Sequence, residues 1–128
     1  MKNAIVKRSS SAALRSRKGA VHPALEPAQL AAVAELFAVL SEESRLRILQ
    51  SLQNGPASVG ELVDELQLKQ ANVSKQLGIL LAAGVIARRQ EGNRAIFSIA
   101  MPLVHDLCGL VCRGLRQQAV ERAAALGG

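Results

Sequence analysis

The sequence predicts one mostly helical domain that carries a small β-hairpin. Its 128 residues are enough for a single compact domain and too few for two of ordinary size. Hydrophobic residues make up 49% of the chain but aromatic residues only 2%, so the core must consist of Leu, Val, Ile and Ala, which are typical of packed helices. Apolar residues also recur at helical spacing in several segments, and two β-favouring segments flank one turn.

The first two helices are predicted from apolar spacing and from the residues at their ends. Pro27 suits the first turn of a helix over about 27–40. The apolar residues that recur along it are Leu30, Val33, Leu36, Phe37 and Leu40. Ser41 is expected to cap a second helix, which the sequence Asn54-Gly55-Pro56 stops.

A helix-turn-helix is predicted from the next two helices. Ser58 and Glu61 have the spacing of a capping box, which starts a short third helix. A tight turn, QLKQ, separates it from a fourth helix that begins near Gln70 and ends at Gly84. Two short helices joined by so tight a turn form a helix-turn-helix.

The C-terminal part is expected to hold a hairpin and a last helix. The segments VIARRQ and RAIFSIA lie on either side of the turn Glu91-Gly92-Asn93, which predicts a β-hairpin. Helical spacing returns from Pro102 to about Ala123. The predicted order of elements is that of a winged helix-turn-helix domain: helix, helix, short helix, turn, helix, basic hairpin and long helix. We therefore expect a DNA-binding and dimerisation domain over 25–124.

The basic charge is concentrated at the N-terminus. The net charge is +6 and the sequence pI about 10.2, yet the residues after position 20 carry equal numbers of basic and acidic groups. We predict a basic flexible tail over 1–24 that attracts any polyanion without reading sequence; an organellar transit peptide is the alternative. The basic residues of this tail are Lys2, Lys7, Arg8, Arg15, Arg17 and Lys18.

Several classes of protein are disfavoured by what the sequence lacks. No uninterrupted apolar run approaches the roughly 18 residues of a membrane span, and the start has no apolar signal-peptide region. A cytoplasmic protein without membrane contact is expected, and the two cysteines form no disulfide framework. No catalytic motif is present, so we expect no enzyme. Two Phe and no Tyr or Trp disfavour RNA, because bases would lack stacking partners.

Three consecutive segments of the chain carry a resemblance to a known family: LSEESRLRILQSL, VGELVDELQLKQANVSKQLGILLAAGVI and ARRQEGNRAIFSIA. They are similar to the second helix, the helix-turn-helix and the wing of the ArsR/SmtB family of transcriptional regulators, which the sequence resembles from about residue 30 to 116. The resemblance implies a homodimer joined through its first and last helices, which binds a near-palindromic operator in double-stranded DNA. It also implies a repressor that an inducer releases. Lys69 stands where the family often has a Ser or Thr cap, so that helix end is expected to be weaker or moved.

The fourth helix is expected to contact the major groove. Its inward residues are Val73, Leu77 and Leu80, which leaves a polar face without acidic residues pointing outward. Gln and Asn can pair with adenine, Lys with guanine or phosphate, and Ser with phosphate. The candidate contacts on this helix are Gln70, Asn72, Ser74, Lys75 and Gln76. An ordinary solvated face is the alternative.

The hairpin is expected to lie along the minor groove or the phosphate backbone. Its candidate contacts are Arg88, Arg89, Asn93 and Arg94. Because side chains alternate along a strand, Arg94 and one of the other two arginines rank first. A winged-helix protein-interaction or dimerisation module without specific DNA readout remains the alternative function. The apolar positions 30, 33, 37, 40, 103, 107 and 110 exceed what so small a core needs, which favours a dimer.

The two cysteines lie on the last helix and leave three interpretations open. His105, Cys108 and Cys112 fall on one stripe of that helix, which Arg116 continues. Cationic neighbours would lower the thiol pKa, and a dimer would bring four sulfurs together for a soft metal ion, arsenite or an oxidant. Inert packing of the thiols is the second interpretation, and an effector bound elsewhere the third. The cysteine and histidine positions through which the family binds metals are not filled in the same pattern here.

Overall fold

The computed structural model of the protein describes residues 23–127, so all but the last two residues of the predicted tail lie outside the described residues. A compact unit begins at Leu36, and the segment up to Glu35 is a separate unit. The elements follow in the order α2 (Pro27–Leu40), α3 (Glu43–Leu52), β1 (Ala57–Ser58), α4 (Val59–Leu66), α5 (Gln70–Ala82), β2 (Ile86–Glu91), β3 (Arg94–Ile99) and α6 (Pro102–Gly127). This order confirms the predicted mainly helical, winged helix-turn-helix architecture.

The junction of α2 and α3 differs from the prediction by one residue. Glu42, and not Ser41, is the N-cap of α3, because its carboxylate accepts a hydrogen bond of 3.0 Å from the backbone N–H of Arg45. The Ser41 hydroxyl instead donates to the carbonyl of Ala38 at 2.7 Å, at the end of α2. Hydrogen bonds from the backbone of Ser44 and Arg45 lower the pKa of Glu42 below its ordinary value of 4.5. The carboxylate also complements the positive end of the helix.

The helix-turn-helix forms where the sequence predicts it. Ser58 and Glu61 make the expected capping box at the start of α4. The turn contains Gln67 in the left-handed region, at a φ of 55°, and α5 begins at Gln70. Lys69 occupies the N-cap position of α5 without a side-chain hydrogen bond, so this helix end lacks the usual cap.

The wing is the hairpin of β2 and β3, which belongs to an antiparallel sheet in the order β1-β3-β2. Glu91 pairs with Arg94, so the turn is the two residues Gly92 and Asn93, shorter than the predicted three. Gly92 has a φ of +60°, as the first position of a tight hairpin turn requires. The two-residue strand β1 was not predicted; it pairs with β3 through Phe97 and Ile96.

One apolar core joins the helices to the sheet. The three inward residues predicted for α5 are buried, together with Leu62 of α4 and Val104 of α6. Arg47 of α3 donates to the carbonyl of Leu66 at 2.6 Å, which ties α3 to the end of α4. Burial in this core fixes which side of α5 faces out.

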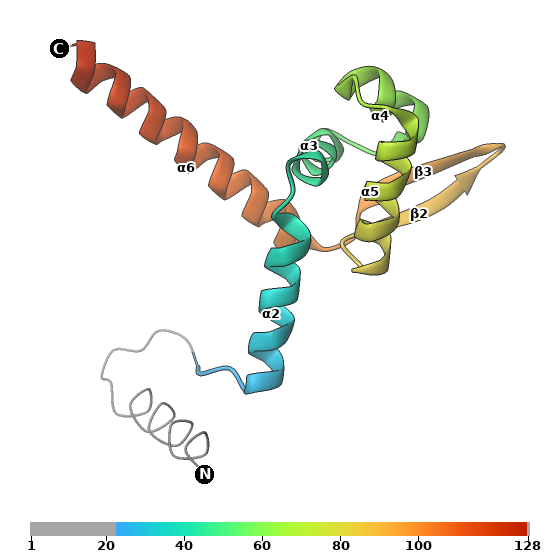
Figure 1. Cartoon of the computed structure of the whole chain (residues 1–128), viewed down its shortest axis with the longest axis horizontal. Helices are drawn as coiled ribbons and strands as arrows, with labels where there is room; N and C mark the ends of the chain where they lie inside the picture. Colours follow the sequence, from blue (N-terminus) through green and yellow to red (C-terminus); the bar gives the residue numbers. More distant parts are fainter. Residues whose placement is uncertain (1–22, 128) are drawn as a thin grey trace. The chain divides into compact units, whose positions relative to one another are not determined.

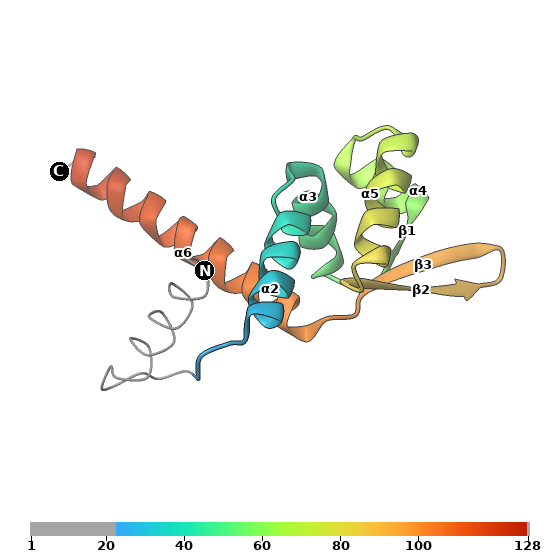
Figure 2. The same cartoon turned by 60° about the horizontal axis from the view of Figure 1, so that its bottom comes forward.

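The wing and α6 extend to opposite sides of the core in both views (Figures 1 and 2). From Leu110 to its end α6 is exposed, and it continues beyond the predicted position 123 to Gly127. The molecule therefore presents two separate surfaces, one around α5 and the wing and one along α6.

No helix among residues 23–127 combines the length and the apolar character that crossing a membrane requires.

Candidate nucleic-acid interface

The outer side of α5 is polar and contains no acidic residue. Gln70, Ser74 and Lys75 are exposed, as predicted, because Val73, Leu77 and Leu80 hold the opposite side in the core. We call these three exposed residues, together with the half-buried Asn72 at their edge, the α5 face. A helix of this kind can enter the major groove, where amide and ammonium groups reach base edges and phosphates.

Gln76 does not point outward, and that part of the prediction is wrong. Its side chain is only 7% exposed because it lies on the flank of α5 that packs towards α3. Its Oε1 accepts a hydrogen bond of 2.8 Å from Arg45 Nη1, and its Nε2 donates to Asn72 Oδ1 at 3.0 Å. Arg45 also donates from Nε to the carbonyl of Val39. Gln76 is therefore a supporting residue behind the α5 face.

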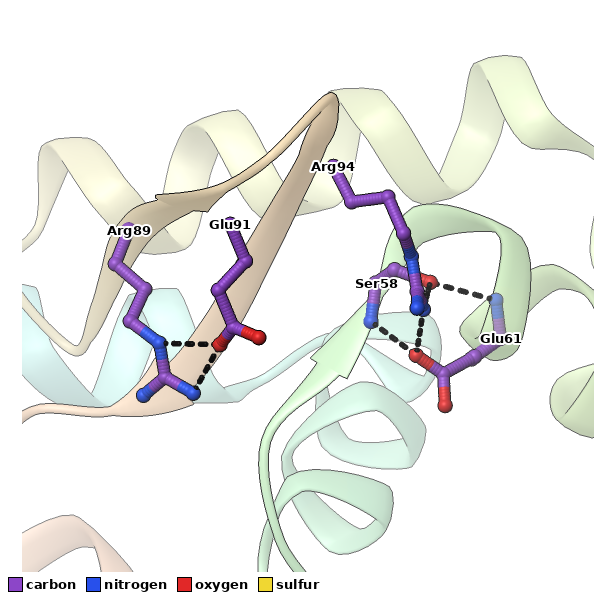
Figure 3. A network of polar contacts seen from close by, with 5 residues as sticks. All are labelled: Ser58, Glu61, Arg89, Glu91 and Arg94. Carbon is purple, nitrogen blue, oxygen red and sulfur yellow. Dashed lines mark hydrogen bonds and ion pairs between the residues drawn. The ribbon is translucent and has the colours of Figure 1, made fainter.

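The wing carries exposed arginines whose guanidinium groups have local partners. Arg89 donates to the carboxylate of Glu91 from two nitrogens, at 2.8 and 2.5 Å, as Figure 3 shows. Arg88 donates to Gln90 at 3.2 Å, and Asn93 is exposed in the turn. These pairs are exposed, and such contacts add little stability, so a phosphate can replace the partners at small cost.

Arg94, at the start of β3, reaches across to the first turn of α4 (Figure 3). Its Nη2 contacts Glu61 Oε1 at 2.5 Å and Ser58 Oγ at 3.0 Å. Ser58, the N-cap of α4, and Glu61 also form the capping box, so one polar cluster joins the wing to the helix-turn-helix. Sequence reasoning identified Arg94 and the capping box separately but not their contact.

The carboxylate of Glu61 should titrate below its ordinary pKa of 4.5. Hydrogen bonds from the backbone and hydroxyl of Ser58 lower this pKa most, and the charge of Arg94 lowers it further. Because the folded-state pKa is lowered, the ionised carboxylate contributes stability that is present above pH 4.5 and lost as the pH falls through the folded-state value.

We expect Arg94→Ala to raise the pKa of Glu61 only part of the way, because the hydrogen bonds from Ser58 remain. NMR titration of the Glu61 carboxyl resonance measures this directly. Arg89→Ala is the matched control, since Arg89 contacts Glu91 instead. An unchanged Glu61 pKa in Arg94→Ala would contradict the contact between the wing and α4.

The thiols of Cys108 and Cys112 lie on α6, at a different surface from the α5 face. Burial raises the pKa of Cys108, and the neighbouring Cys112 raises it further, which is opposite to the expected effect of cationic neighbours. Cys108 packs against the core, whereas Cys112 is exposed. The predicted grouping with His105 does not assemble in one chain: within the part that the structure describes, no three His, Cys, Asp or Glu side chains gather so as to hold a metal ion.

Both thiols border an apolar groove formed by the end of α2, α3 and α6. Its exposed apolar members include Phe37 and Leu115, which are 55% and 61% exposed. The remaining lining residues are Leu40, Glu43, Leu46, Arg47, Gln50, Gln53, Leu107 and Val111. We call this surface the α6 groove. It leaves a large apolar area open in the single chain, as the apolar positions of the first and last helices predict.

Known proteins are similar to this chain in both sequence and fold. A family model described as a helix-turn-helix domain matches residues 40–89. The uncharacterised HTH-type transcriptional regulator Rv0081 of Mycobacterium tuberculosis is 40% identical over 94 residues, which cover 73% of this chain and 82% of that protein. Its crystal structure matches with a TM-score of 0.66 and 38% identity, covering 77% of this chain and 99% of that chain.

Two further matches describe the group more closely. The probable mercury resistance operon repressor of Streptomyces lividans is 32% identical over 93 residues, covering 73% of this chain and 71% of that protein. The homodimeric winged helix-turn-helix DNA-binding domain of Mb0332 from Mycobacterium bovis, a possible ArsR-family regulator, matches with a TM-score of 0.66 and 28% identity, covering 77% of this chain and 91% of that chain. This chain therefore belongs to the ArsR/SmtB family of winged helix-turn-helix transcriptional regulators, which bind DNA and are not enzymes.

Proposed function

We propose that the protein is a homodimeric repressor that binds a near-palindromic operator and is released by an inducer. The observation that carries the proposal is the α5 face, which is polar, exposed and free of acidic residues, next to a wing with exposed arginines. In this proposal Gln70, Asn72, Ser74 and Lys75 enter the major groove. The wing lies along the minor groove or the phosphates.

The proposed dimer forms through α2 and α6. Exposed apolar side chains on both helices support this, because isolated chains in water rarely leave so many uncovered. They include Leu30, Val33 and Phe37 on α2 and Leu103, Leu110, Val111 and Leu115 on α6. A dimer would present its two α5 faces about 34–36 Å apart, one helical turn of DNA, to the two halves of an operator.

The role described for one relative and the oligomeric state of another support the proposed repressor function. The Streptomyces protein is a probable repressor of a resistance operon, and the Mycobacterium bovis domain is homodimeric. Repression by occupying an operator, in the cytoplasm, is accordingly the function proposed for this chain.

For the inducer, the surroundings of Cys108 favour the packing interpretation of that thiol in the single chain. Cys108 lies against the core with a raised pKa, so its reactive thiolate is disfavoured at neutral pH. Cys112 is exposed on the α6 groove. Sensing at Cys108 and Cys112 therefore requires the second subunit, whose thiols would meet the thiols of the first across the proposed dimer. The inducer would then be a soft metal ion, arsenite or an oxidant.

Lys75→Ala should reduce the preference for the operator over unrelated duplexes by about 1–3 kcal/mol, because the exposed ammonium group reaches a base edge in the groove. Selection of bound sequences from random duplexes supplies the operator, and fluorescence anisotropy in a salt series measures the affinities. Removal of residues 1–20 is the contrasting variant. It should weaken all duplexes alike and flatten the salt dependence, because it removes six basic groups.

The alternative is a winged-helix interaction module without specific DNA readout. It predicts that the parent protein selects no sequence from random duplexes. It also predicts that Lys75→Ala binds every duplex as the parent does. Either result would overturn the proposed function.

A further inference from the structure

We propose that Arg45 and Gln76 determine which bases Asn72 can recognise, by holding the Asn72 amide so that only its NH₂ group is available to the groove. This inference rests on the proposed function, because it assumes that α5 enters the major groove. It concerns three side chains from two helices that form one chain of hydrogen bonds. Arg45 lies on α3, and Gln76 and Asn72 lie one turn apart on α5.

The chain of hydrogen bonds begins at a group that can only donate. A guanidinium group has five N–H donors and no acceptor. Arg45 Nη1 lies 2.8 Å from Gln76, so the Gln76 atom that faces it must be the oxygen, Oε1. A second bond from Arg45 Nε to the carbonyl of Val39 holds the guanidinium group in this orientation.

The orientation of the Gln76 amide then determines the orientation of the Asn72 amide. With Oε1 of Gln76 directed at Arg45, the other end of the same amide is the donor Nε2. Nε2 lies 3.0 Å from Asn72, which must therefore face it with the acceptor Oδ1. Gln76 is only 7% exposed, so rotation of its amide would leave a buried donor facing another donor, at a cost of about 1–3 kcal/mol. The orientations of both amides thus follow from the arginine.

The free end of Asn72 is consequently a donor. Among residues 23–127 no acceptor bonds to its Nδ2, and Asn72 is half-buried at the edge of the exposed side of α5. Asparagine usually recognises adenine by donating to N7 and accepting from N6, which uses both ends of its amide. Here the oxygen is directed at Gln76. The remaining NH₂ group is a donor, and it suits guanine and thymine best, because their major-groove edges present only acceptors. Adenine presents its acceptor N7 beside an amino group, and cytosine presents only an amino group.

Gln76→Glu should reverse this preference. A carboxylate at position 76 accepts from Arg45 with one oxygen and offers its other oxygen to Asn72, so the Asn72 amide turns its NH₂ inward and its oxygen outward. An acceptor at the groove favours the amino bases adenine and cytosine. The pairing with Arg45 keeps the substituted side chain satisfied in its buried position.

Selection from random duplexes with the parent, Asn72→Ala and Gln76→Glu tests the inference. Asn72→Ala should flatten the preference at one position of each half-site, which identifies the base read by Asn72. At that position the parent should favour guanine or thymine on the strand that Asn72 faces, by about 3- to 10-fold, as expected for one hydrogen bond. Gln76→Glu should favour adenine or cytosine there by a similar factor.

Gln70→Glu is the matched control, since it adds the same charge to an exposed position of α5 without touching Asn72. It should weaken binding but keep the keto preference. The inference is overturned if Asn72→Ala changes no position, or if Gln76→Glu leaves the base preference at the Asn72 position as it is in the parent. A parent that selects no sequence at all overturns the proposed function instead, so the two failures are distinguishable.

Discussion

Leu115→Glu is expected to convert the dimer into monomers and to weaken operator binding by about 10²-fold or more. Leu115 is 61% exposed in the single chain and lines the α6 groove beside Phe37 and Val111. In the proposed dimer a partner covers this surface, and a glutamate at position 115 would have to be buried among the apolar side chains that line most of the groove. The second half-site would then no longer bind as part of the same complex, which removes the gain from two linked contacts.

Val120→Glu is the matched control for this prediction. Val120 is also 61% exposed, lies on the same helix and is outside the α6 groove. Sedimentation velocity should give a monomer for Leu115→Glu and a dimer for Val120→Glu. Both variants should bind a duplex with one half-site equally well, because neither substitution touches the α5 face. A dimeric Leu115→Glu protein would exclude the α6 groove as the dimer interface.

Local signals in the sequence predicted most of the elements and their boundaries. The capping box of Ser58 and Glu61 forms as expected, because its two members are three residues apart and need no other part of the chain. The prediction that Val73, Leu77 and Leu80 lie on the buried side of α5 was likewise correct. Helical periodicity reports burial well where the buried residues are apolar.

Gln76 was assigned to the wrong side of α5 because its burial depends on a distant partner. It is a polar residue on the flank of the apolar stripe, and periodicity alone counts it as outward. Arg45, which satisfies its amide oxygen, lies 31 residues earlier in the chain. Arg94 and Glu61 are separated by 33 residues. No local pattern pairs such residues, so contacts of this kind appear only once the fold is known.

Two other differences have similarly physical causes. Strand β1 has only two residues, too few for an alternating pattern, and it exists because β3 lies beside it. At the start of α3, Ser41 and Glu42 are adjacent residues that can both serve as caps. The sequence does not decide between them, because the choice depends on how α2 ends.

Leu80→Ala should destabilise the folded protein by about 2–5 kcal/mol, because it leaves a cavity where α5 meets the core. Leu80 is fully buried, at 0% exposure. Domains of this size unfold with only about 5–15 kcal/mol, so the loss is a large part of the total. Urea unfolding followed by circular dichroism measures it, at one protein concentration because dimerisation couples to folding.

Lys75→Ala, on the exposed side of the same helix, should change the unfolding free energy by less than about 0.5 kcal/mol. The two variants therefore separate two ways of losing operator binding. At a urea concentration where the parent is still folded, Leu80→Ala should lose binding because fewer of its molecules are folded, and binding should recover when the protein concentration is raised, since dimer formation favours the folded state. Lys75→Ala should remain folded and keep its defect at every concentration, because its missing contact is with DNA. Equal unfolding free energies for the two variants would contradict the assignment of Leu80 to the inner side and Lys75 to the outer side of α5.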